Sequence, residues 1–345
     1  MYDTFFKRIQ ETSATSDLQA ANARVLDKAY PSEDPVKPQK KLIIGIAALI
    51  SLMLSCGMAY LLEMLNNTIR TSRDVEDKLN LPVLGVLPAL PQALVKQGIG
   101  RLFLDKQQRA FIESVRTIRT SLTMSTLGQQ KKVIAVTSTL PGEGKSSTAA
   151  NIALALGQLS STLIIDADLR RPTVAKTFAI KGGSAGLANV LSGHTPVSEC
   201  LHTRDGIKVM PAGMIPPDPT QLFSEARFEK LVRRLSETFE VIIIDCPPMT
   251  GISDTLMITR FCDALMYVVE SGRASQSAIS HATGRLLQNS APLSGVVLNK
   301  FNTQRQQGED GYYGYYDYHG YSEPTEKQSE PKKRKRKVVD TTAVS

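Results

Sequence analysis

The sequence has 345 residues, of which 42% are hydrophobic and 21% are charged. These values are ordinary for a folded protein with room for one large domain and additional segments. They exclude a disordered chain, a collagen-like repeat and a disulfide-rich scaffold. The formal net charge is +8, but six of the positive charges form a single run at 332–337 (KKRKRK). Removing that run leaves 8 − 6 = +2, so the basicity belongs to the C-terminal tail.

Residues 42–62 (LIIGIAALISLMLSCGMAYLL) form an uncharged apolar run. A helix of this length spans roughly 30 Å, which is the thickness of a bilayer core. The run therefore predicts a transmembrane helix, with a buried helix of a soluble domain as the alternative. It is too long, and too far from Met1, for a cleaved signal peptide. The lysines before it slightly favour a cytoplasmic N-terminal side, whereas the domain that follows it argues for the opposite orientation.

The rest of the chain divides by composition. Residues 1–41 are polar and end in a proline-rich stretch with Pro31, Pro35 and Pro38, and we expect an extracytoplasmic segment there. Residues 63–105 are predicted to be a juxtamembrane linker that contains a helix at 72–79. Residues 302–345 lack apolar periodicity and are predicted to be a flexible tail.

From residue 106 to 301, apolar runs alternate with amphipathic stretches. This alternation predicts an α/β domain in which a mostly parallel sheet is flanked by helices on both faces. The predicted strands are 133–137, 163–165, 207–210, 241–244, 264–269 and 295–298.

A glycine-rich turn follows the first of these strands, in the segment VIAVTS-TLPGEGKSS-TAANIALAL. Glycines allow backbone N–H groups to face phosphate oxygens, a lysine can reach the β- and γ-phosphates, and a serine hydroxyl can bind Mg²⁺. The pattern is that of a P-loop, except that Thr139 stands where the first glycine is usual. The expected nucleotide-binding residues are Gly142, Glu143, Gly144, Lys145, Ser146, Ser147 and Asn299. For Asn299, base recognition and loop capping are both open.

Carboxylates follow two other predicted strands: Asp166 and Asp168 after 163–165, and Asp245 after 241–244. Open α/β sheets bind ligands at the carboxyl ends of their strands. Any one of these residues could instead be a helix cap or turn residue, but together they predict one site. Ser146, Asp168 and Asp245 are the expected Mg²⁺ ligands.

The motifs PGEGKSS, LIIDADLRRP and VIIIDCPP resemble the Walker A, A′ and B motifs of the bacterial tyrosine kinases (BY-kinases). Partition ATPases of the MinD/ParA type carry a signature lysine at the position of Leu140. Glu113, Arg116 and Arg119 match the ExxRxxR motif through which BY-kinases form rings, and at this spacing they share one helical face. A merely solvated charged face is the alternative.

The membrane region resembles the second half of a Wzc-like polysaccharide co-polymerase, in which a proline-rich stretch precedes the second transmembrane helix. Family members of the one-chain type begin with a first transmembrane helix and a long periplasmic domain. Neither is recognisable in this sequence, so we expect an N-terminally shortened form or a fragment.

A cluster of tyrosines interleaved with glycines precedes the basic run. One interpretation of this tyrosine cluster is an adhesive low-complexity tail. The resemblance implies instead that a neighbouring subunit phosphorylates the cluster. The basic run could pair with the phosphorylated cluster or with anionic lipid, rather than with nucleic acid. The expected acceptors are Tyr312, Tyr313, Tyr315, Tyr316, Tyr318 and Tyr321.

The resemblance implies an ATP- and Mg²⁺-dependent protein-tyrosine autokinase of the bacterial inner membrane, with a cytoplasmic kinase domain. Lys145 would hold the phosphates, Asp168 would lie near the metal, and Asp166 would accept the tyrosine proton, although Asp166 and Asp168 can exchange roles. The implied partners are other subunits in a ring, the polysaccharide polymerisation and export machinery, and a tyrosine phosphatase. Two alternatives remain: a membrane-tethered MinD/ParA-like ATPase, and a structural scaffold of an export complex.

Overall fold

The computed structural model describes residues 2–16, 38–65, 67–124, 133–215, 218–224, 226–251 and 253–302. The chain divides into two units, 1–65 and 66–345. Pro31, Pro35, the six predicted acceptor tyrosines and the basic run lie outside the described residues.

The described residues of the first unit, 2–16 and 38–65, form the helices α1 (Tyr2–Ser16) and α2 (Lys40–Leu65). The segment Lys40–Leu62 of α2 has a mean hydropathy of 2.4, and none of it is buried against the protein. The predicted apolar helix is therefore present, and it is long and apolar enough to cross a membrane.

The second unit is built around one sheet of eight strands among the described residues, in the order β1-β8-β7-β2-β6-β3-β5-β4. Every neighbouring pair is parallel except β4 and β5, which are antiparallel. The strands are β1 (Val83–Pro88), β2 (Val133–Ser138), β3 (Thr162–Asp166), β4 (His202–Arg204), β5 (Ile207–Met210), β6 (Val241–Asp245), β7 (Ala264–Glu270) and β8 (Leu293–Phe301).

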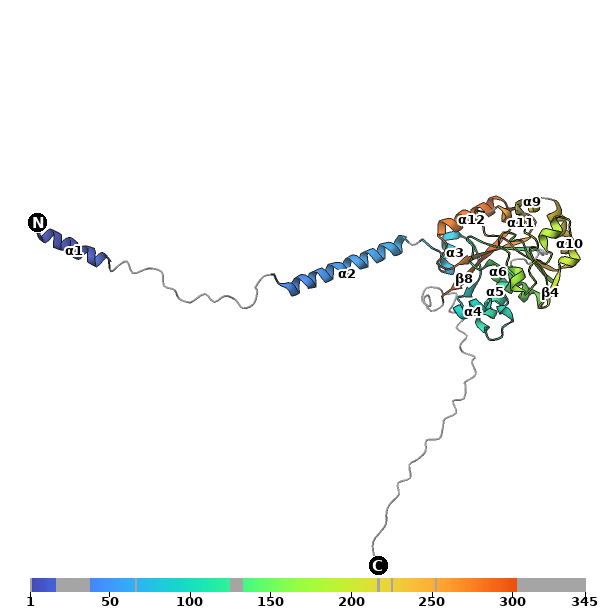
Figure 1. Ribbon diagram of the computed structural model, residues 1–345, viewed down its shortest axis with the longest axis horizontal. Coiled ribbons are helices and arrows are strands. Elements are labelled where there is room, and N and C mark those ends of the chain that lie inside the picture. The colour runs from blue at the N-terminus through green and yellow to red at the C-terminus, as the bar shows by residue number, and fades with distance from the viewer. Residues whose placement is uncertain are drawn as a thin grey trace, which may run out of the picture. The chain divides into compact units, whose positions relative to one another are not determined.

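Helices cover both faces of this sheet (Figure 1). One face packs against α3 (Ser72–Leu79), α8 (Leu187–Leu191), α9 (Pro219–Ser224), α10 (Ala226–Thr238), α11 (Asp254–Thr259) and α12 (Gln276–Gln288). The other packs against α5 (Arg109–Met124), α6 (Lys145–Gly157), α7 (Val174–Thr177) and the 3-10 helix η1 (Leu102–Leu104). Two further short helices are α4 (Gln92–Gln97) and η2 (Val197–Cys200).

The alternation of side chains along each strand explains the two cores. On β6, Ile242 and Ile244 belong to the core under α10 and α11, while Ile243 belongs to the core under α5 and α6. Because both faces are buried, the central strands are continuous apolar runs, as parallel sheets require. This is why these strands were easy to predict from the sequence.

All six predicted strands are present, and the predicted helix at 72–79 is α3 with the same bounds. The sequence marks the start of α3 clearly. The Thr71 hydroxyl accepts the Asp74 N–H at 3.0 Å, and the Asp74 carboxylate accepts the Thr71 N–H at 3.0 Å. This reciprocal pair is a capping box.

The structure differs from the sequence prediction between 63 and 105, where a linker was expected. There β1 joins the edge of the sheet, parallel to β8, and α3 and η1 contribute to the two cores. The folded unit therefore begins well before residue 106. The three-residue edge strand β4 was also not predicted.

Candidate active site

The glycine-rich loop lies between β2 and α6, as its sequence predicts. Gly142 and Gly144 have φ values of +85° and +95°, which residues that carry a Cβ atom rarely adopt. At Gly144 a Cβ would also lie 2.1 Å from the Asn299 Nδ2 atom. Both glycines are thus required by backbone conformation, and Gly144 also by close packing.

Glu143 lies within this loop, but its side chain points into the protein. It is fully buried, its Oε2 atom accepts the Leu140 N–H at 2.6 Å, and its Oε1 atom accepts the Glu270 N–H at 3.4 Å. Burial raises the pKa of this carboxyl group. The Glu143 side chain therefore supports the loop from inside the protein, and the prediction that this residue binds nucleotide rests on its backbone.

Asn299, near the end of β8, also contacts the loop. Its amide Nδ2 donates to the Glu143 carbonyl at 2.8 Å, and its Oδ1 accepts the Lys300 N–H at 2.9 Å. Both polar atoms of the side chain are engaged. Of the two readings left open by the sequence, this arrangement favours loop capping over base recognition.

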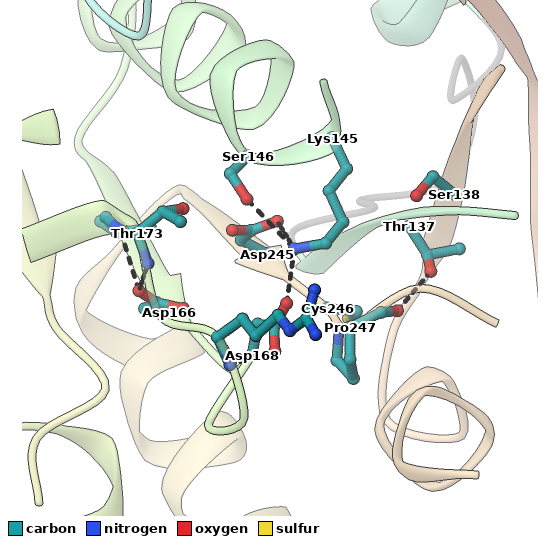
Figure 2. Close-up of polar contacts among 12 residues, drawn as sticks. Thr137, Ser138, Lys145, Ser146, Asp166, Asp168, Thr173, Asp245, Cys246 and Pro247 are labelled. Carbon is teal, nitrogen blue, oxygen red and sulfur yellow. Dashed lines mark hydrogen bonds and ion pairs between the residues drawn. The ribbon is translucent and has the colours of Figure 1, made fainter. Parts of the chain in front are cut away.

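Lys145 lies among the predicted acidic residues (Figure 2). Its Nζ atom is 2.9 Å from Asp168 Oδ2, 3.3 Å from Asp245 Oδ1 and 3.1 Å from the Ser146 hydroxyl. Burial alone would lower the pKa of Lys145, but attraction to Asp245 and Asp168 outweighs it and raises the pKa. The lysine is therefore held as a buried cation at the start of α6.

Asp166 lies beside this group but is turned toward α7 (Figure 2). Its Oδ2 atom accepts the N–H groups of Thr173 at 3.0 Å and Val174 at 2.9 Å, while its buried Oδ1 atom has no hydrogen-bond partner among the described residues. Burial, and then the charge of Asp245, raise the pKa of Asp166 to about 8. A carboxyl group with this pKa exchanges a proton near neutral pH.

The cluster holds more carboxylate than its lysine can neutralise. Asp166, Asp168 and Asp245 surround one ammonium group, and burial raises the pKa of Asp245 as well as that of Asp166. The Asp245 Oδ2 atom is buried, and within the part of the chain that the structure describes it has no hydrogen-bond partner. Excess buried carboxylate, unpartnered oxygen and the Ser146 hydroxyl form a donor set that fits a hard divalent cation such as Mg²⁺.

Arg170, which follows Asp166 and Asp168 in the segment LIIDADLRRP, is held by residues that the sequence did not indicate. Its Nε atom lies 3.0 Å from the buried Asp254 carboxylate, which also accepts the Thr220 hydroxyl at 2.7 Å. Asp254 opens α11 and Thr220 lies in α9, so only the fold brings them to Arg170. In the sequence, the position of Asp254 directly after Ser253 indicates the start of a helix but not a contact with Arg170.

The predicted oligomerisation motif lies on α5. Glu113 and Arg116 are exposed and form an ion pair at 2.5 Å. Arg119 is half-buried and donates to the Ala155 carbonyl of α6 at 3.0 Å. The structure thus presents Glu113 and Arg116 at the surface and uses Arg119 partly to join two helices.

An open hollow with a volume of about 110 Å³ adjoins the start of α6. Leu87, Pro88, Val95 and Ile99 give it apolar walls, and Ser147 and Asn151 contribute polar atoms. A second hollow, of about 480 Å³, lies between α8, η2 and α10 and is lined by none of the predicted site residues. The first is lined by the residues that directly follow the phosphate loop in α6.

Comparison with known proteins agrees with this geometry. A family model described as the NUBPL iron-transfer P-loop NTPase (ParA) matches residues 129–325, and one described as a G-rich domain on putative tyrosine kinase (GNVR) matches residues 1–64. The tyrosine-protein kinase CpsD of Streptococcus agalactiae serotype III (strain NEM316) is 35% identical over 200 residues, which cover 57% of this chain and 85% of that protein.

The tyrosine-protein kinase etk of Escherichia coli (strain K12) is 25% identical over 319 residues, covering 87% of this chain and 44% of that protein. Among solved structures, the kinase domain of Escherichia coli ETK superposes with a TM-score of 0.62 at 25% identity, covering 66% of this chain and 94% of that chain. The VpsO kinase domain gives a TM-score of 0.53 at 33% identity, covering 58% of this chain and all of that chain.

The family-model match places this chain in the class of P-loop NTPases of the ParA type. The chain belongs, within that class, to the bacterial tyrosine-protein kinases. The resemblance inferred from the motifs is thereby confirmed, as is the P-loop fold. Nucleotide binding follows from membership of this class.

Proposed function

We propose that this chain is a protein-tyrosine autokinase that transfers the γ-phosphoryl group of ATP to the tyrosine cluster of a neighbouring subunit. The observation that carries the proposal is the buried group formed by Lys145, Ser146, Asp168 and Asp245 at the phosphate loop. Phosphoryl transfer requires positioning and charge neutralisation more than covalent chemistry, and this group supplies a cation, a hydroxyl and carboxylates at one place.

In this proposal the loop N–H groups and Lys145 would hold the phosphates, with Lys145 exchanging its contacts to Asp168 and Asp245 for phosphate oxygens. The base would enter the mouth of the open hollow lined by Leu87 and Ile99, whose walls are mainly apolar, as in ligand pockets.

Ser146, Asp168 and Asp245 would hold Mg²⁺. When bound, Mg²⁺ neutralises charge on the phosphate oxygens. The three residues lie around Lys145 Nζ, and Asp245 keeps an oxygen without a partner.

In the transfer step, the phenol oxygen of a tail tyrosine bonds to the γ-phosphorus, and the bond from that phosphorus to the β–γ bridging oxygen breaks. ADP leaves, and the phenol proton passes to Asp166. Asp166 suits this role because one of its oxygens has no partner in the described segments and its pKa is about 8. Asp168 suits it less, since its oxygens contact Lys145 and the Arg171 N–H.

The acceptor tail would come from another subunit of a ring joined through α5. The exposed pair Glu113–Arg116 supports this, because it is available at the surface while the apolar face of α5 is buried. Exchanging the charges in the double variant Glu113→Arg/Arg116→Glu keeps the pair within the helix. If α5 joins subunits, sedimentation will show a smaller assembly at unchanged thermal stability; an unchanged assembly would refute this contact.

The wider setting follows from the same proposal. The helix at 42–62 would anchor the chain in the inner membrane, with the ATP-consuming unit in the cytoplasm and residues 1–41 outside. The kinase would regulate capsular or exopolysaccharide polymerisation and export, and a tyrosine phosphatase would reverse its action. Leu140 supports a kinase over a MinD/ParA-like ATPase, because the signature lysine of those ATPases is absent.

A mixing experiment tests transfer between subunits. A Lys145→Met chain that keeps its tail is combined with an active chain whose six tail tyrosines are changed to Phe, using ATP with a labelled γ-phosphate. We expect label on the Lys145→Met chain, since only that chain offers acceptors. Absence of label there, with an active wild-type control, would refute transfer between subunits.

A further inference from the structure

Glu270, at the end of β7, joins two cations on the outer side of the phosphate loop. Its Oε2 atom lies 2.7 Å from Arg273 Nη1 and 2.9 Å from Lys300 Nζ. Arg273 lies in the turn that follows β7, and Lys300 lies in β8, so the carboxylate joins the end of β7 and its turn to β8.

Each of these cations also donates to a carbonyl of the phosphate loop. Arg273 Nη2 contacts the Pro141 carbonyl at 2.9 Å, and Lys300 Nζ contacts the Gly142 carbonyl at 3.0 Å. The Glu270 backbone N–H reaches the Glu143 side chain at 3.4 Å. We call Glu270, Arg273 and Lys300 the rim clamp.

The rim clamp acts on the part of the loop with the greatest backbone freedom. Gly142 and Gly144 both have positive φ, and glycine is the residue that loses most conformational freedom when a loop is ordered. When the N–H groups of a loop point toward phosphate, some of its carbonyl groups point away from the phosphate. These carbonyls need hydrogen-bond donors from elsewhere in the protein. Arg273 and Lys300 are those donors for Pro141 and Gly142.

The turn that carries Arg273 is itself fixed by backbone contacts. The Gly272 N–H donates to the Ile69 carbonyl at 2.7 Å, and the Ser271 hydroxyl donates to the Arg70 carbonyl at 2.7 Å. Arg273 is therefore presented to the loop from a supported position.

A competing view is that these are ordinary surface ion pairs. The side chains of Arg273 and Lys300 are 42% and 39% exposed, and exposed pairs often contribute little to stability. The two views differ in what they predict. A surface ion pair would have no effect on nucleotide binding, whereas a clamp on the loop changes the fraction of loops able to bind phosphate, and apparent affinity falls with that fraction.

We propose that Glu270, Arg273 and Lys300 are positioning residues that hold the phosphate loop in its nucleotide-binding conformation and so set the affinity of the kinase for ATP. This inference rests on the proposed function for its physiological meaning, but nucleotide affinity can be measured without tyrosine transfer. Glu270 and Arg273 do not line the hollow proposed for the base, whereas Lys300 does. The single variant Arg273→Ala, which should also weaken binding, therefore separates the effect on the loop from a direct contact with the base.

The test uses the full chain in detergent and the double variant Arg273→Ala/Lys300→Ala. We measure Kd for a fluorescent ATP analogue, KM and kcat for tail phosphorylation, and the unfolding temperature without nucleotide. We expect Kd and KM to rise about tenfold, kcat to change less than about twofold, and the unfolding temperature to stay within about 2 °C. The conservative pair Arg273→Lys/Lys300→Arg should recover most of the lost affinity.

The matched control is Lys230→Ala/Arg233→Ala on the exposed side of α10, which removes the same charge far from the loop in sequence and contacts. It should bind like wild type. Should Arg273→Ala/Lys300→Ala fail to fold, Glu270→Gln keeps the side-chain volume and removes only the charge, and about a threefold rise in Kd is expected.

An unchanged Kd in the clamp variants, or a loss of kcat at constant KM, overturns the inference. The two proposals fail separately. If wild type binds the analogue but labels no tyrosine, and the clamp variants still bind more weakly, the clamp stands and the proposed function falls. If wild type labels its tail and the clamp variants bind equally well, the clamp falls alone.

Discussion

At the scale of single residues, Lys145 lies among more negative charge than it can neutralise. Three buried carboxylates share one buried ammonium group, and the pKa values of Asp166 and Asp245 are raised. The empty site therefore binds a proton more readily than isolated carboxylates would, and a bound cation would compete with that proton. Such a site favours binding of a metal–nucleotide pair at the expense of the stability of the empty fold.

The raised pKa of Asp166 predicts that the stability of the fold depends on pH. Its pKa is 3.8 when unperturbed and about 8 in the fold, raised by burial and then by Asp245. Between these values the folded state binds a proton that the unfolded state has lost, so folding stability falls as pH rises from about 4 to about 8.

We therefore expect Asp166→Asn to flatten this dependence and to be more stable than wild type at pH 8, while losing at least about 100-fold in kinase activity. Urea unfolding of the kinase unit at several pH values measures the first effect. Asp77→Asn, on the exposed side of α3, is the control and should follow wild type. A variant that is less stable than wild type at pH 8 would contradict the assignment.

Gly144 gives a second prediction at this scale. Gly144→Ala introduces a Cβ at φ +95° and 2.1 Å from Asn299 Nδ2, so the loop must shift and nucleotide binding should weaken by more than about tenfold. Gly284→Ala is the matched control, because Gly284 lies within α12 with open space around it. There alanine should leave binding unchanged and stabilise by up to about 1 kcal/mol. Equal binding by both variants would contradict the role of the loop.

The chemical groups of this site could be predicted from the sequence, because carboxylates at the ends of parallel strands meet at one edge of a sheet. Their supports could not. Asp254, Glu270 and Arg273 act through contacts with residues 84 to 132 positions away in the chain, and no local pattern reports such contacts. Position in the loop predicts that Glu143 lies at the nucleotide site, but it does not show that the Glu143 side chain is buried against the Leu140 and Glu270 N–H groups.

Among the secondary-structure elements, β1 differs most from the prediction, because a linker was expected at its position. Pro82, Pro88 and Pro91 surround its short apolar run, and prolines usually mark edge strands or connections. The strand is at the edge of the sheet, consistent with that rule, and it pairs only with β8 among the described strands. Central strands were found because burial on both faces leaves them uniformly apolar.

The packing of β1 against α5 gives a prediction at this scale. Ile118 is fully buried, and the position of a Cβ on Gly85 would lie 2.6 Å from its Cγ1 atom, so the isoleucine fills the space left by the glycine. Ile118→Ala should lower the free energy of unfolding by about 2–4 kcal/mol. Thr120→Ala, on the exposed side of α5, should change it by less than about 0.5 kcal/mol. A loss below about 1 kcal/mol for Ile118→Ala would mean that this edge is not part of the cooperative fold.

At the scale of the whole molecule, the chain joins one apolar helix to a nucleotide-binding α/β unit. The helix has no buried face within the protein, whereas residues 66–345 contain two cores on opposite faces of the sheet. The excess positive charge and six of the ten tyrosines lie in the tail beyond the described residues. Its role as the acceptor is therefore the central claim to test.

The most direct measurement is labelling of the full chain with ATP that carries a labelled γ-phosphate, in wild type, Lys145→Met and a variant with the six tail tyrosines changed to Phe. The account predicts label on the wild-type tail and none on either variant, with Lys145→Met folded as judged by its unfolding temperature. Label that survives the loss of Lys145 or of all six tyrosines would contradict the account, and ATP hydrolysis without labelled protein would instead identify a membrane-tethered ATPase.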